Sequence, residues 1–224
     1  MGRILEPEVM DDDLEVDAYL DGVATRHLDR LDGTFIAAVL ALRPEPRARI
    51  LDVGTGTGSI PVRLAMARPE ARVTAVDLSA PMLARARRAA SRAGVAIQFR
   101  RGNARRLPFR TSSFDLVMSN SLLHHLPDPV PVLDEVARVL RPGGSLFIRD
   151  LRRPPDRSIA AHIRHHGRHY RGLMKKLFAD SVRAAYTLPE IRAAVDNSRL
   201  AGAVVRRMFT TYWVIEKRPR RRRR

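Results

Sequence analysis

The spacing of apolar positions predicts alternating strands and helices from about residue 48 onward. A short apolar run at residues 49–53 ends in a glycine cluster, and residues 60–67 then carry apolar side chains at helical spacing. The unit repeats with a strand at 71–77 and a helix from 79 to 94, which opens with Ser and an early Pro and closes with Gly. Such alternation predicts parallel strands joined by crossover helices.

Further apolar segments extend this pattern in both directions along the chain. They predict strands at 97–100, 114–119 and 145–150, helices within 13–42 and at about 130–140 and 188–198, and a closing antiparallel hairpin at 203–208 and 210–216. The fold class expected is α/β: a Rossmann-like, doubly wound, mostly parallel seven-stranded sheet with an antiparallel C-terminal strand and helices on both faces.

The length of 224 residues suits one core with a small accessory element, so we expect one domain. Its parts are expected to be an N-terminal helical cover at 1–45, a cofactor-binding core at 46–150, a basic helical lid at 151–200, closing strands at 201–217 and a disordered arginine tail at 218–224.

Composition excludes several kinds of chemistry. The chain has no cysteine, so disulfides, thiolate metal sites and cysteine nucleophiles are ruled out. The acidic N-terminal region lacks the pattern of a signal peptide, and the longest apolar run, at 35–42, is far too short to span a bilayer. We therefore expect a cytoplasmic protein without a membrane span.

The formal net charge of +17 raises the possibility of a nucleic-acid partner. Lys175, Lys176 and Lys217 are the only lysines, so 41 − 3 = 38 of the basic residues are arginine, and the tail after Lys217 contributes six of them. Genome base composition can produce such a skew without any partner. Nucleic acid is therefore the weaker expectation, and the oligomeric state stays open.

Three alternate glycines follow the first predicted strand in the sequence LDVGTGTG, at Gly54, Gly56 and Gly58. Without side chains, their backbone amides can approach a ligand closely. The spacing G-x-G-x-G differs from the dinucleotide pattern, and no Lys follows to form a phosphate-binding loop. Asp77 ends the second strand, where a carboxylate can accept hydrogen bonds from both hydroxyls of an adenosine ribose.

Five segments in order, LDVGTGTG, AVDLSAPML, GNARRLPF, FDLVMSNSLLHHL and LRPGG, resemble the successive motifs of class I methyltransferases that use S-adenosylmethionine (SAM). The similarity spans about residues 48–150 and is greatest to the ubiquinone/menaquinone-biosynthesis-like (methyltransferase type 11) branch. The resemblance implies that the cofactor is SAM, that the activity is methyl transfer and that the partner is a small-molecule acceptor.

The resemblance also assigns residues to the cofactor. The glycines would wrap the methionine part, Asp77 would hold the ribose, and Asn103 would stand where relatives usually have Asp. The set implied to bind the cofactor is Asp52, Gly54, Thr55, Gly56, Gly58, Asp77, Leu78, Met82, Asn103, Ala104 and Asn120.

Two adjacent histidines, His124 and His125, follow Asn120 closely. An imidazole can remove a proton from a phenol, enol or amine acceptor, so they are the candidate catalytic residues. The alternative is that one packs structurally and the other faces solvent. Methyl transfer from SAM depends mostly on alignment, so we expect no metal.

Several other residues have weaker interpretations. Tyr19 and Arg26 would belong to helices that cover the cofactor. Tyr212 and Trp213 could line the acceptor but are more typical of a core. The later segment contains four histidines, and we interpret it as a basic lid helix and not as a metal site. These histidines are His162, His165, His166 and His169.

Three alternatives to a small-molecule methyltransferase stay open. RNA or DNA could be the acceptor, although SNSLLHH differs from the motif of many adenine-modifying enzymes. The chain could bind SAM without catalysis, as a regulator. A nicotinamide dehydrogenase is disfavoured by the glycine spacing.

Overall fold

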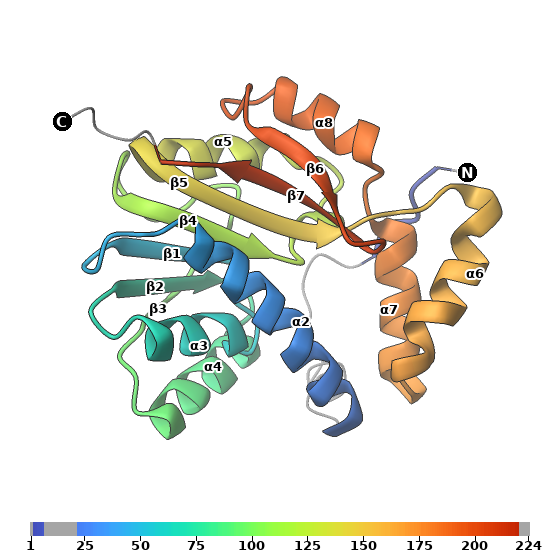
Figure 1. The fold of residues 1–224 in the computed structure, drawn as a ribbon, viewed down its shortest axis with the longest axis horizontal. Coiled ribbons are helices and arrows are strands. Elements are labelled where there is room, and N and C mark those ends of the chain that lie inside the picture. The colour runs from blue at the N-terminus through green and yellow to red at the C-terminus, as the bar shows by residue number, and fades with distance from the viewer. Residues whose placement is uncertain (1, 7–21, 220–224) are drawn as a thin grey trace.

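The computed structural model describes residues 2–6 and 22–219 and contains a seven-stranded sheet (Figure 1). The strand order is β3-β2-β1-β4-β5-β7-β6, and among these strands only β7 runs against the others. The strands are β1 (Arg49–Val53), β2 (Arg72–Asp77), β3 (Gln98–Arg101), β4 (Phe114–Asn120), β5 (Leu140–Leu151), β6 (Val204–Met208) and β7 (Tyr212–Lys217). The predicted Rossmann-like fold class is confirmed.

Helices cover both faces of this sheet. They are α2 (Gly22–Ala41), α3 (Ser59–Ala67), α4 (Ala80–Ala93), α5 (Val130–Val139), α6 (Asp156–His166), α7 (Gly172–Ala184) and α8 (Leu188–Asp196), with short 3₁₀ turns η1 (Leu123–His125) and η2 (Gly167–His169). Helices α2 to α4 lie on one face and α5 and α8 on the other, whereas α6 and α7 stand beyond the carboxyl ends of the parallel strands (Figure 1).

Alternating side chains of the strands divide the core into two layers. Ile50 of β1 packs with Phe35 of α2, whereas its neighbour Leu51 packs with Val136 of α5. All four are buried. Since successive side chains of a strand point to opposite faces, one uninterrupted apolar strand can anchor helices on both sides.

Local signals set the ends of α4 next to the cofactor end of the sheet. The Ser79 hydroxyl accepts a hydrogen bond from the backbone N–H of Met82, and Gly94 closes the helix in the left-handed conformation with φ of 65°. These are the cap and the stop that the sequence indicated. They fix the start of α4 directly after the carboxyl end of β2.

Strand β5 is longer than expected. The strand was expected only from residue 145, after a Pro-Gly-Gly loop, but it begins at Leu140, which pairs with Phe114. The register then shifts, and Leu116 pairs with Ser145. The Pro-Gly-Gly segment thus forms an irregularity within the strand, because a bulge absorbs extra residues without ending the ladder.

The segments around the central sheet differ in their bounds and neighbours from those that the sequence predicted. The hairpin of β6 and β7 is present. Helix α8, expected within the lid, packs instead against α5 and β6. Of the predicted N-terminal helices, residues 13–21 lie outside the described part, and α2 covers the rest up to Ala41. None of the helices in the described part of the chain is long and apolar enough to cross a membrane.

Candidate functional site

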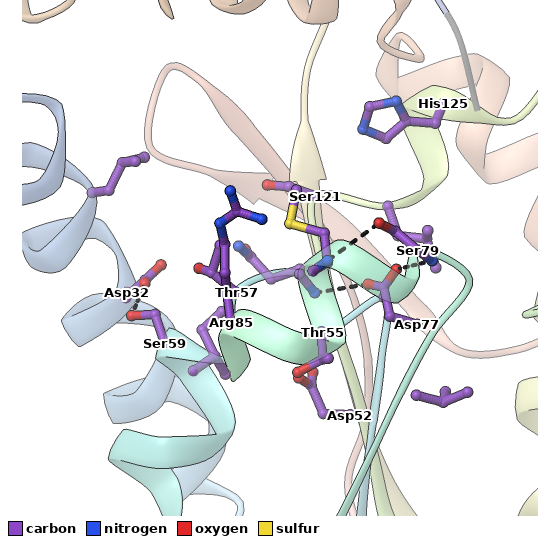
Figure 2. A pocket seen from close by; sticks show the side chains of 18 of the residues that line it. Asp32, Asp52, Thr55, Thr57, Ser59, Asp77, Ser79, Arg85, Ser121 and His125 are labelled. Atoms are coloured by element: carbon purple, nitrogen blue, oxygen red, sulfur yellow. Dashed lines mark hydrogen bonds between the residues drawn. The ribbon is translucent and has the colours of Figure 1, made fainter. Parts of the chain in front are cut away.

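A single cavity of about 840 Å³ opens at the carboxyl ends of the parallel strands. Its walls come from the turn after β1, the end of β2, the start of α4, the segment after β4 and helices α2 and α7. Figure 2 shows Asp77 and His125 on the walls of this same cavity. In open α/β sheets ligands bind at this edge, where the strand order reverses, and β1 and β4 meet here.

The glycine turn has a backbone that other residues rarely adopt. Gly54, Gly56 and Gly58 all have positive φ, of 74°, 54° and 83°. A Cβ atom on Gly58 would lie 2.8 Å from the Cβ of Ala86, so this glycine lets α3 approach α4. A Cβ on Gly56 would meet nothing within 4 Å, and Gly56 lines the cavity. The turn therefore keeps open space over its backbone, as a ligand requires.

Asp77 holds this turn in place. Its Oδ2 accepts a hydrogen bond of 2.8 Å from the backbone N–H of Gly56, and its Oδ1 accepts one of 2.9 Å from that of Ser79 (Figure 2). Asp77 also lines the cavity, so its carboxylate can reach a ligand bound there. The geometry brings the glycine turn and Asp77 together, as the cofactor hypothesis requires.

Asp52, below the turn, is a buried acid with an unused acceptor. Its side chain is 2% exposed, and its Oδ2 has no hydrogen-bond partner among the described residues. Burial raises its pKa from 3.8 to about 7. The hydroxyl of Thr55 beside it partly offsets this rise in the pKa. Both residues line the cavity, and the unpartnered Oδ2 of Asp52 fits the α-ammonium group of an amino-acid ligand such as SAM.

The residues expected around the adenine all line the cavity. Leu78 is 36% exposed and Met82 is 7% exposed, so they can cover an apolar ring from the α4 side. Asn103 Oδ1 accepts a hydrogen bond from the backbone N–H of Arg105. This bond uses part of the capacity of the same oxygen to accept a hydrogen bond from adenine. Its amide group thus has a fixed orientation beside Ala104. Contact with the adenine stays a prediction.

Asn120 is oriented by a buried arginine that the sequence did not single out. The Nε–H of Arg149 donates to Asn120 Oδ1 at 2.8 Å, and its Nη1 donates to Leu31 O and Thr34 Oγ1 in α2. The Arg149 side chain is 1% exposed, and burial lowers its pKa. Because Asn120 accepts from Arg149 through its oxygen, its amide N–H groups are left for the cavity.

The two histidines lie in η1, and His124 is fixed by a carboxylate. His124 Nδ1 lies 2.5 Å from Asp150 Oδ1, and Asp150 also accepts from the backbone N–H groups of Leu123, His124 and Leu151. Burial disfavours the charged imidazole, but the carboxylates of Asp150 and Glu6 outweigh it and raise the pKa of His124 to about 10. The same imidazole lowers the pKa of Asp150 against the effect of burial.

Glu6 reaches the histidine pair from the N-terminal strap, as we call residues 2–6. Its Oε1 lies 3.2 Å from His124 Nε2 and 3.1 Å from His125 Nδ1, and its Oε2 accepts from the Ser181 hydroxyl in α7. Burial raises the pKa of Glu6, but the nearby histidines and Ser181 produce a net decrease. No periodicity or motif in the sequence pointed to Glu6.

Arg3 anchors this strap. Its guanidinium stacks 3.5 Å from the ring centre of Tyr186 and donates to the backbone carbonyls of Ala184, His124, Leu126 and Pro127. Such multiple bonds from one rigid guanidinium fix both position and direction. The strap is therefore tied to the turn that carries the histidines and to the end of α7.

Beyond the histidines the cavity is apolar and aromatic. Tyr170, Met174 and Phe178 pack together with Leu151 and Tyr212 in one cluster, and all five also line the cavity. Such a wall suits a flat apolar ligand. The sequence left open whether Tyr212 and Trp213 line the acceptor site or belong to the core. Tyr212 contributes to this wall, whereas Trp213 is fully buried in the core.

The remaining candidates have separate outcomes. Tyr19 lies outside the described residues, and Arg26 belongs to α2. The later histidines form ring pairs, His162 with His166 and His165 with His166. Within residues 2–6 and 22–219 they form no group able to hold a metal, and the one such group is Glu6, His124 and His125.

Comparison with known proteins gives the family context of this geometry. A family model described as a methyltransferase domain matches residues 51–148. The chain is 38% identical over 135 residues to 27-O-demethylrifamycin SV methyltransferase of Amycolatopsis mediterranei, covering 59% of this chain and 47% of that protein. It is 40% identical over 119 residues to demethylmenaquinone methyltransferase of Thermus thermophilus, covering 53% and 54%.

The fold is also similar to a solved structure. Magnesium protoporphyrin IX methyltransferase from Synechocystis, with bound SAH (S-adenosylhomocysteine), superposes with a TM-score of 0.64 over 89% of this chain and 90% of that chain, at 19% identity. At this identity the similarity concerns the fold. The chain spans about half the length of the curated relatives it matches.

Proposed function

We propose that the chain is a class I SAM-dependent methyltransferase, as the match of residues 51–148 to a methyltransferase domain supports. We further propose that it transfers the methyl group of SAM to a hydroxyl of a small aromatic acceptor. The observation that supports this proposal is one continuous cavity with two chemically different ends. One end carries the glycine turn and Asp77, and the other carries the histidine pair and an aromatic wall.

At the first end, side chains match the parts of SAM. Asp77 would accept hydrogen bonds from the ribose hydroxyls, and the unpartnered Oδ2 of Asp52 would accept one from the α-ammonium group. Leu78 and Met82 would cover the adenine. SAM supplies an activated methyl group on a sulfonium, so the protein needs chiefly to align it with the acceptor and exclude water.

At the second end, His124 and His125 would face the atom that receives the methyl group. Asp150 fixes the ring orientation of His124 through Nδ1, and Asn120 would offer amide N–H groups between the two ends. A hydroxyl acceptor must lose its proton as its oxygen forms the new bond to carbon. His124 and His125 both line the cavity, which supports a role for this pair in that loss.

The aromatic wall and one relative support an oxygen acceptor on an aromatic molecule. Tyr170, Phe178 and Tyr212 offer ring surfaces for stacking. The relative from Amycolatopsis is named for methylation at an oxygen of a rifamycin. The relative from Thermus is named for a menaquinone precursor, which keeps a quinone-like ring within the proposal.

Nucleic acid is the second candidate acceptor, because arginines line the rim of the cavity: Arg63, Arg85, Arg88, Arg92 and Arg105. Most of them lie on α4 and the turn after β3, which also carry Met82 and Asn103. They therefore surround the predicted adenosine end. The wall beside the histidines is apolar, which suits a metabolite better than a polyanion.

Two measurements test the proposal. Calorimetric titration with SAM and with NADH should give micromolar binding for SAM and none for NADH. Transfer of a radioactive methyl group from SAM should occur to some members of a panel of hydroxylated aromatic compounds and not to short RNA. Tight SAM binding without transfer to any acceptor would favour a regulatory module, and absence of SAM binding would refute the assignment.

A further inference from the structure

A buried carboxylate and two imidazoles converge at the acceptor end of the cavity. The ligand atoms that Glu6, His124 and His125 can offer all lie within 4.8 Å of one another. The Glu6 oxygen Oε1 lies 3.2 Å from His124 Nε2 and 3.1 Å from His125 Nδ1. Ligands of a tetrahedral zinc ion lie roughly 2.0–2.2 Å from it, which separates neighbouring ligand atoms by roughly 3.3 Å.

The carboxylate oxygen shared by this group lies between the two imidazoles. Glu6 Oε1 is buried and forms ion-pair contacts with His124 Nε2 and His125 Nδ1. The Glu6 side chain is only 10% exposed. A cation bound by these atoms would take the place of the imidazole protons that now face the carboxylate. Two imidazole nitrogens and one carboxylate oxygen are typical ligands of a divalent transition-metal cation.

Hydrogen bonds behind the ligands hold two of them in place. Asp150 Oδ1 faces His124 Nδ1 at 2.5 Å, the carboxylate–histidine pairing that commonly orients a metal-bound imidazole through its second nitrogen. The Ser181 hydroxyl donates to Glu6 Oε2, which leaves Oε1 as the inward oxygen. Arg3 fixes the strap three residues before Glu6 by contacts with Tyr186 and neighbouring carbonyls.

We propose that Glu6, His124 and His125 form a binding site for one divalent transition-metal cation, such as Zn²⁺, Co²⁺ or Mn²⁺. Two imidazoles, which bind a cation after losing their shared-side protons, together with one carboxylate favour this class over Mg²⁺ or Ca²⁺, which prefer oxygen ligands. The carboxylates of Glu6 and Asp150 together balance the two positive charges of the cation. Three protein ligands leave a coordination position toward the cavity, which His124 and His125 line.

The role of the cation rests on the proposed function, whereas its binding does not. Beside an acceptor hydroxyl, the cation would withdraw electron density from the oxygen, so that the hydroxyl loses its proton to solvent more readily. A lone pair of that oxygen then forms the O–C bond as the S–C bond of SAM breaks. The products are the methyl ether and S-adenosylhomocysteine. The histidines would thus act as ligands and not accept the proton themselves.

The test is metal binding by the untagged full-length protein after treatment with a chelator. Titration with Co²⁺, followed by visible absorption, should show one equivalent bound in a site of mixed nitrogen and oxygen ligands, and Zn²⁺ should displace it. Glu6→Gln keeps the size of the side chain and should weaken Co²⁺ binding by about 10-fold or more, because it removes the charged ligand. SAM affinity, measured in parallel, should stay unchanged and reports on folding.

Two matched variants separate this site from other binding. Glu70→Gln changes an exposed glutamate in the turn between α3 and β2, and His166→Gln changes a histidine of α6. Both should bind Co²⁺ like the unmodified protein. The proposal is overturned if no stoichiometric Co²⁺ binds, if Glu6→Gln binds it equally well, or if His166→Gln abolishes binding. Failure to bind SAM would instead count against the proposed function.

Discussion

The end of the cavity where we propose that SAM binds, the cofactor end, is lined mainly by residues 52–120. The end where we propose that the acceptor binds, the acceptor end, combines segments that are far apart in the chain. At the cofactor end, Gly56 bonds to Asp77, only 21 positions away, and both follow neighbouring parallel strands. At the acceptor end, Glu6 meets His124 and Ser181, 175 positions from it. The proposed cofactor site is thus built from local strand–turn units, while the proposed acceptor site is surrounded by segments that only the complete fold assembles.

The largest effect is expected at the cofactor end, from Asp77→Ala. This change removes the acceptors of the ribose hydroxyls and of the Gly56 amide. Hydrogen bonds to a charged group contribute about 1.5–3 kcal/mol each, so SAM should bind about 100-fold more weakly or worse. Calorimetry measures the affinity, with Asp196→Ala, an exposed residue at the end of α8, as the control. Equal SAM affinity in both variants would contradict the proposed ribose contact.

The second largest effect is expected at the acceptor end, from Asp150→Asn. An amide cannot accept all of the bonds that Asp150 makes to the backbone and to His124. Loss of such an orienting partner typically costs about 10–100-fold in activity or metal affinity. We expect kcat to fall by this factor while SAM affinity changes less than about threefold.

The control for Asp150→Asn is Glu216→Gln, which changes another buried carboxylate, paired with Arg206 and Arg218 on the far strands. It should leave kcat nearly unchanged. If Asp150→Asn lowers SAM affinity as strongly as kcat, the two ends of the cavity do not act independently.

Substitutions of two glycines at the cofactor end, Gly56 and Gly58, separate the effect of helix packing from the effect of ligand contact. Gly58→Ala places a methyl group against Ala86 at positive φ, which should lower the free energy of unfolding by about 3 kcal/mol. Gly56→Ala meets open space, so only backbone strain of about 1 kcal/mol is expected. Thermal unfolding should rank the variants in this order. For each kcal/mol of unfolding free energy that is lost, Gly56→Ala should weaken SAM binding more than Gly58→Ala does. The reason is that the methyl group of Gly56→Ala enters the cavity.

The smallest effect is a pH dependence specific to the cofactor end. Burial raises the pKa of Asp52 to about 7, so below this pH the ligand-free protein holds Asp52 largely protonated. The α-ammonium group of SAM favours the ionised form, and binding therefore releases a proton. SAM affinity should rise with pH up to about 7, by at most about tenfold per pH unit, and level off above. Asp52→Asn should remove this dependence, and a slope that persists in the variant would assign it to another group.

Sequence reasoning could predict the cofactor end because its signals are local. The glycine spacing and Asp77 lie at the ends of predictable strands, and the structure brings them together by a hydrogen bond. Asp150 was missed, although it lies near the end of the fifth strand, at the same edge of the sheet, and could have been found by that reasoning. Arg149 was missed for another reason: a buried arginine is identified by its partners, and these lie at the end of β4 and in α2.

The order of strands and helices, the glycine turn and its acidic partner were determined by the amino-acid sequence, since hydrophobic period, caps and glycines act within a few residues. The acceptor end was decided only by the tertiary structure. Glu6 has no sequence signal, because its role depends on Arg3 bonding to carbonyls near residues 124 and 184. Contacts between such distant segments follow from packing of the whole chain, and local patterns carry no information about them.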